Sequence, residues 1–139
     1  MVAFNKYHCF VENLAEKTHN LASDTLKVAL TNTVPNASTH TVLANIGEIT
    51  AANGYTAGGN QTTQSSSAQS GGTYTLVSGD PATWTASGGT LGPFRYAVLY
   101  NATAAGGPLI GWWDYGTSIT LNAGETFTVD IGASTLTLT

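Results

Sequence analysis

The sequence predicts an all-β protein, a jelly roll or β-sandwich of about eight to ten short antiparallel strands with one N-terminal helix. Alternating apolar and polar runs are separated by turn signals about every 8–12 residues, which is typical of sandwiches and jelly rolls. The 139 residues include 23 threonines and 16 glycines but only 12 charged residues, and this composition suits strands and tight turns. At this length we expect one core.

The helix is expected within residues 4–20, in an N-terminal segment (1–22) that precedes a β domain (23–139). Its apolar residues recur at helical spacing: Phe4, Tyr7, Val11, Leu14 and Leu21. An apolar stripe on a lone helix needs a covering surface. We therefore expect this segment to pack either on the β domain or on a partner.

Alternation marks the strands of the β domain. In 125–131, Phe127, Val129 and Ile131 face one side of the strand. Residues 42–46 form either a helical turn or a short strand. The polar segment Asn60–Ser70 is either disordered or an edge strand facing solvent or a partner, and its place between strands favours the edge strand. Further strands are expected at 25–31, 48–50, 73–77, 81–86, 117–121 and 134–139.

Residues 92–116 form an aromatic hairpin that holds two of the three tryptophans. Trp112 and Trp113 are neighbours in one strand, so they point to opposite faces and at most one belongs to the main core. The other is exposed, covered by the N-terminal helix or buried against another subunit. Arg95, the only base after Lys27, is expected either to pair with Asp114 on the adjacent strand or to anchor an interface.

Charge and hydropathy argue against several partners. The net charge is −4 and no basic stripe is present, so we expect no nucleic-acid binding. No apolar run approaches the ~18 residues of a membrane span, and the first twenty residues do not resemble a secretion signal. Cys9 is the only cysteine, which rules out an internal disulfide bond. We expect synthesis in a reducing cytoplasm and no membrane partner.

The sequence contains no pattern typical of an enzyme, a metal site or a cofactor site. His8, Cys9 and His19 lack the spacing of metal ligands. No Gly-x-Ser-x-Gly elbow is present, and Asp114 has no identifiable second carboxylate for hydrolysis. We therefore predict no catalytic residue, no metal and no cofactor.

Four segments stand out together in chain order: Ser23–Thr33, Asn53–Gly59, Gly92–Asn101 and Leu109–Gly116. As an ordered set they resemble the capsid cement (decoration) proteins of tailed bacteriophages, and the resemblance spans nearly the whole chain. It implies a jelly roll without an active site, bound to the outer surface of an HK97-fold shell of major capsid protein. It also implies assembly in the bacterial host cytoplasm and stabilisation of the shell against the pressure of packaged DNA.

Three segments are expected to make the contacts with the major capsid protein or with further copies of the chain: the N-terminal helix, Asn60–Ser70 and the C-terminal strand Ser134–Thr139. The candidate interface residues are Phe4, Tyr7, Val11, Arg95, Trp112, Thr135, Leu136, Thr137 and Leu138. A terminal edge strand can add to a neighbouring sheet through backbone hydrogen bonds.

Other functions remain open at this stage. One is a carbohydrate-binding module in which Trp112 or Trp113 stacks on a sugar together with Tyr115. Another is a head–tail or tail component of a phage particle. A third is a small hydrolase that uses Asp114.

Overall fold

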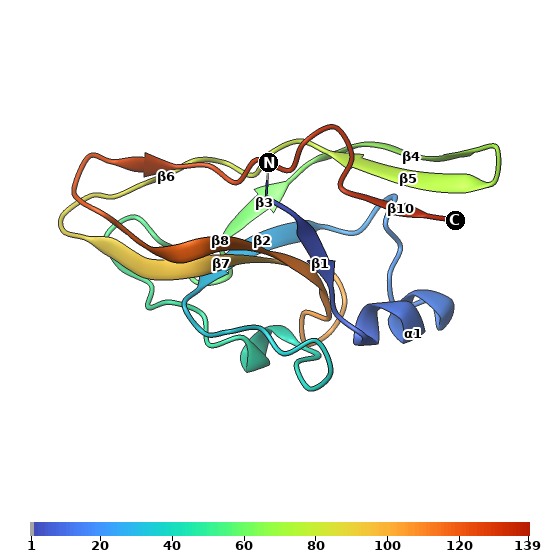
Figure 1. Cartoon of the computed structure of the whole chain (residues 1–139), viewed down its shortest axis with the longest axis horizontal. Helices are drawn as coiled ribbons and strands as arrows, with labels where there is room; N and C mark the ends of the chain where they lie inside the picture. The colour runs from blue at the N-terminus through green and yellow to red at the C-terminus, as the bar shows by residue number, and fades with distance from the viewer. Residues whose placement is uncertain (1) are drawn as a thin grey trace.

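A five-stranded antiparallel sheet forms one layer of the structure, a computed structural model that describes residues 2–139 (Figure 1). Its long central strands come from the predicted aromatic hairpin, which pairs Tyr96 with Asp114 and Val98 with Trp112. In spatial order the strands are β1 (Phe4–Lys6), β8 (Leu109–Leu121), β7 (Leu91–Asn101), β2 (Leu26–Thr31) and β3 (Asn60–Thr62).

Two smaller antiparallel sheets form the second layer, along the upper side of Figure 1. Thr63 joins β3 to the first of these sheets, so the chain passes directly from one layer to the other. The prediction of an all-β sandwich is confirmed. The strands of this layer, in sheet order, are β10 (Leu136–Leu138), β5 (Thr73–Ser78) and β4 (Gln64–Ser70), and then β6 (Trp84–Thr85) with β9 (Thr126–Phe127).

The main core lies between the layers, and a second apolar cluster covers the outer face of the large sheet. Trp113 is 2% exposed in the main core, near Trp84 and Phe94. Trp112 points to the other face and packs on Tyr7, with ring centroids 4.7 Å apart. The 3₁₀ helix η1 (Leu43–Asn45) lies over this second cluster. The large sheet is therefore covered on both faces, and each of the two adjacent tryptophans packs against a different apolar cluster.

The N-terminal segment differs from the prediction, which was wrong to begin the helix at residue 4. Phe4–Lys6 is strand β1, paired with Trp113–Gly111 of β8, and helix α1 spans only Cys9–Ala15. The free edge of β8 binds this segment through its backbone, which outweighs the local helical pattern. The helix consequently buries Phe10 and leaves Val11 53% exposed.

The expected edge strand at Asn60–Ser70 is confirmed as β3 and β4. The expected strand at 134–139 is present as the shorter β10, and residues 42–46 contain the 3₁₀ helix η1. The prediction of a strand at 48–50 was wrong, because Glu48 makes only an isolated bridge with Thr31. The seven residues of α1 are too few to cross a bilayer, and nowhere else in residues 2–139 is there a helix that could.

Candidate functional site

A groove on one side of the sandwich separates two strand edges. β1 is one of the two edge strands of the large sheet, and β10 is an edge strand of the three-stranded sheet. The groove between them has a volume of about 320 Å³. Its lining residues are Phe4, Lys6, Phe10 and the run Ser134–Leu138. The groove therefore combines apolar side chains with two backbone edges beside which the described part of the chain places no further strand.

β10 and the residue before it are hydrogen-bonded to strand β5. The backbone N–H of Thr135 donates to the Leu76 carbonyl oxygen (2.8 Å), and the Ser78 N–H donates to the Thr135 hydroxyl (3.0 Å). Leu136 is buried in the main core. Thr137 and Leu138 remain at least partly exposed. The final strand is thus held along one edge, where Leu136–Leu138 pair with Leu76–Tyr74 of β5, and its other edge faces outward.

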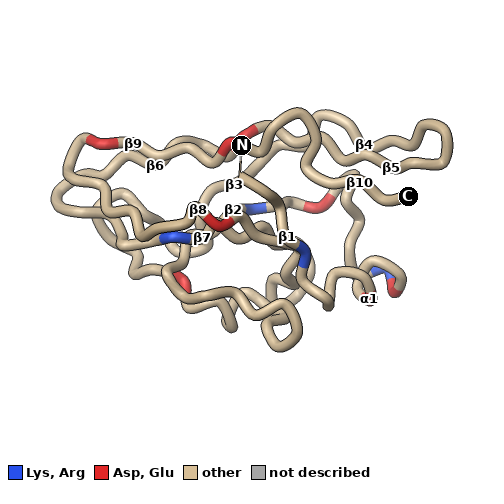
Figure 2. The backbone as a smooth tube through the Cα atoms, viewed as in Figure 1, with Lys and Arg blue, Asp and Glu red and all other residues tan. Residues whose placement is uncertain are grey.

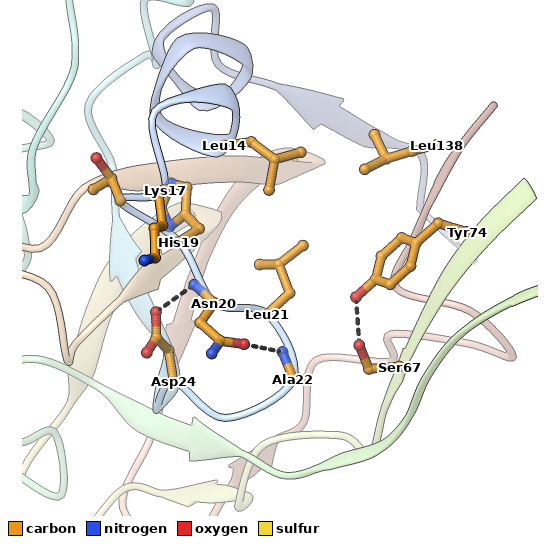
Figure 3. Close-up of a pocket in the computed structure, with 11 residues that line it drawn as sticks. Leu14, Lys17, His19, Asn20, Leu21, Ala22, Asp24, Ser67, Tyr74 and Leu138 are labelled. Atoms are coloured by element: carbon orange, nitrogen blue, oxygen red, sulfur yellow. Dashed lines mark hydrogen bonds between the residues drawn. The ribbon is translucent and has the colours of Figure 1, made fainter.

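A second and larger hollow, of about 550 Å³, lies between α1 with its following turn and the β4–β5 hairpin (Figure 3). Leu14, Leu21, Tyr74 and Leu138 surround its apolar part. The Tyr74 hydroxyl is held by the Ser67 hydroxyl at 2.8 Å. Leu138 lines both hollows, so they adjoin at this side chain.

A buried polar cluster forms one wall of the larger hollow. The Asn101 side-chain carbonyl accepts the N–H groups of Thr103 (2.9 Å) and Ala104 (3.1 Å), which leaves its NH₂ group for Asp24 (2.6 Å) and His19 Nδ1 (3.1 Å). Nδ1 of His19 must therefore accept, and the proton lies on Nε2. Burial lowers the pKa of His19, against the opposing effect of Asp24. Both the accepting Nδ1 and the lowered pKa favour the neutral imidazole.

Arg95 lies outside both hollows and pairs with Asp114, as expected. Its Nε and Nη2 atoms donate to the two carboxylate oxygens at 2.7 and 3.0 Å. The guanidinium also lies 5.2 Å from the centroid of the Tyr96 ring. These hydrogen bonds lower the pKa of Asp114 and raise that of Arg95. Each of the two side chains is about one-third exposed. The pair is therefore a surface ion pair that links β7 and β8.

The structure unites five of the nine candidate interface residues in the β1–β10 groove. These are Phe4, Thr135, Leu136, Thr137 and Leu138. Tyr7 is fully buried, so the prediction that it contributes to an interface surface was wrong. Lys6 and Phe10 were missed, because Phe10 lies off the helical stripe and neither residue stands near residues 134–138 in the sequence.

The aromatic residues considered for sugar stacking pack against other side chains of the same chain. Trp113 is buried against Phe4, with ring centroids 5.0 Å apart. Tyr115 meets Phe127 edge to face at 5.1 Å, and Trp112 packs against Tyr7 with the two rings tilted by 55°. In residues 2–139 no three His, Cys, Asp or Glu side chains gather as metal ligands would.

Comparisons with protein-family models, with curated proteins and with solved structures gave no match for this chain. The geometry of the groove is suited to an extended peptide segment. Such a segment can pair with a strand edge while its alternate side chains enter the apolar hollow.

Proposed function

We propose that the protein is a capsid cement protein, which binds the outer surface of an HK97-fold shell of major capsid protein and stabilises it. The β1–β10 groove is the observation that supports this proposal best. An extended segment of a shell subunit adds to an open edge there through backbone hydrogen bonds. Its apolar side chains contact Phe4, Phe10 and Leu138 in the two adjoining hollows.

The electrostatics of the groove suit binding to a protein surface. Lys6 is the single charged side chain that lines it, so docking desolvates few charges. Weak binding by one copy is sufficient on a repeating lattice when linked copies bind together. The ordered resemblance of four sequence segments to cement proteins supports the same assignment.

The experiment uses empty expanded shells assembled from the major capsid protein encoded beside this chain's gene. Purified full-length chain is titrated onto the shells and bound protein is measured by co-sedimentation. We expect saturable binding, with density on the outer surface in cryo-electron microscopy. Absence of binding to such shells, or the absence of a capsid gene in that neighbourhood, would contradict the proposal.

A single substitution tests the groove within this experiment. Leu138→Asp places a carboxylate where the two hollows adjoin, and we expect shell binding to fall ~10-fold or more because the charge must be desolvated. Thr139→Asp is the matched control, since Thr139 is exposed and lines neither hollow. Deleting residues 134–139 is less informative, because it also removes Leu136 from the core. Equal binding by both variants would place the shell contact elsewhere.

A further inference from the structure

The β4–β5 hairpin carries an open strand edge that is separate from the β1–β10 groove. β4 pairs with β5 from Ser66 opposite Val77 to Ser70 opposite Thr73, and within residues 2–139 no strand lies on its other side. Figure 1 shows the hairpin reaching one end of the long axis of the molecule, beyond the large sheet. The backbone N–H and C=O groups on the outer side of β4 are therefore presented at an accessible edge.

From Ser66 to Ser70 this edge lacks the features that normally keep an edge strand unpaired. Proteins protect such edges with charged side chains, proline or bulges. The single irregularity in β4 lies at its base, between Gln64 and Ser66. From Asn60 to Gly79 the sequence contains neither a charged residue nor a proline, and β4 and β5 are uncharged throughout in Figure 2.

The hairpin is held in one conformation before any partner binds. At its base the Gln64 side-chain amide donates to the carbonyl oxygens of Asp24 (2.6 Å) and Leu21 (3.3 Å). At its tip Gly71 and Gly72 have φ values of 58° and 86°, as a tight two-residue hairpin turn requires. An edge that is already ordered loses little conformational entropy on pairing.

We propose that β4 pairs antiparallel with β4 of a second copy across a two-fold axis, which joins two three-stranded sheets into one of six strands. Antiparallel pairing of identical edges is self-complementary, so one patch serves both copies. Full overlap of Ser66–Ser70 places Ala68 opposite its own symmetry mate. The chain has a net charge of −4, and this neutral edge is where two copies meet without like-charge repulsion.

This dimer does not depend on the proposed shell binding, because it uses the edge of β4 and not the strand edges of the β1–β10 groove. Each dimer carries two such grooves, and a two-site contact raises the avidity for a lattice. Self-association is measured with the purified chain alone, so its failure and the failure of shell binding are distinct results.

The experiment is sedimentation velocity of the full-length chain over a range of concentrations. We expect a monomer–dimer equilibrium that weakens ~10-fold or more in Ala68→Lys and in Ala68→Glu, because each places like charges at the two-fold axis. Mixing the two variants is expected to restore the dimer as a heterodimer. Thr75→Lys is the matched control: Thr75 is the cross-strand partner of Ala68 on the inner strand β5.

Three results would overturn this dimer. The first is a wild-type chain that stays monomeric up to ~1 mM, well above the dissociation constants of specific complexes. The second is a dimer that both Ala68 variants leave unchanged, which would locate the contact on another surface. The third is a monomeric chain whose binding to shells falls in Ala68→Lys but not in Thr75→Lys, which would assign the β4 edge to a shell subunit. Circular dichroism verifies that each variant is folded.

Discussion

Gly111 of β8 lies against the ring of Phe4, and this contact lets strand β1 pack at the edge of the large sheet. A Cβ atom at position 111 would overlap the Phe4 ring and the Asn5 carbonyl oxygen. Gly111 pairs with Lys6 in the same register. One wall of the β1–β10 groove therefore depends on the absence of a side chain at this position.

We predict that Gly111→Ala lowers the free energy of unfolding by about 1–3 kcal/mol, because the added methyl group overpacks this contact. Urea denaturation measures the change. Gly79→Ala is the matched control, since a Cβ at position 79 meets only the Thr63 carbonyl oxygen at 3.9 Å. Equal stability of the two variants would show that β1 adjusts freely over β8.

Glu48 organises the glycine-rich segment 53–59. Its carboxylate accepts the Tyr55 hydroxyl (3.0 Å) and the Gly58 N–H (2.7 Å), while the Tyr100 hydroxyl donates to the Gly58 carbonyl (2.6 Å). We predict that Glu48→Ala costs about 1.5–3 kcal/mol of stability, because two donors lose a charged acceptor. Denaturant unfolding tests this, with Glu125→Ala as control: Glu125 caps an exposed turn through the Asn122 N–H. A smaller loss in Glu48→Ala than in Glu125→Ala would contradict the prediction.

His19 makes stability depend on pH. Burial lowers its pKa in the folded state, so the unfolded chain binds the proton more readily. The stability that neutral His19 contributes is therefore fully present above the unfolded pKa of ~6.5. As the pH falls below that value, the free energy of unfolding decreases by at most ~1.4 kcal/mol per pH unit. Unfolding measured between pH 7.5 and 5 is expected to show this slope in the wild type and to lack it in His19→Gln. Identical slopes would rule out His19 as the cause.

The Arg95–Asp114 pair controls the titration of the carboxylate. Hydrogen bonds from Arg95, and one from the Gly116 N–H, lower the pKa of Asp114. We predict that Arg95→Gln raises that pKa toward the ordinary value of ~3.9, as followed by carboxyl chemical shifts in an NMR titration. The stabilisation from this carboxylate is present above its unfolded pKa and is lost as the pH falls through the lower folded value. An unchanged Asp114 titration in the variant would contradict the assigned cause.

Much of the β-sandwich is predictable from alternation, because the two-residue period of a strand is a local property of the chain. Val129 and Ile131 are buried as that pattern predicts, although the regular strand β9 ends at Phe127. Arg95 and Asp114 were matched correctly since they belong to the two arms of one hairpin. A pairing of this kind can be predicted, because the two strands are neighbours in the sequence and are joined by a turn.

The remaining parts of the fold were determined by pairing between segments that lie far apart in the sequence. Asn5 lies opposite Trp112, 107 positions along the chain, and the helical spacing of Phe4 and Tyr7 contained no sign of that partner. The β1–β10 groove likewise unites Phe4 and Phe10 with residues 134–138. Residue types and local periods predicted strands, turns and an edge strand at Asn60–Ser70. Tertiary structure alone determined which edges stay open, because a strand edge is open only where no other segment has paired with it.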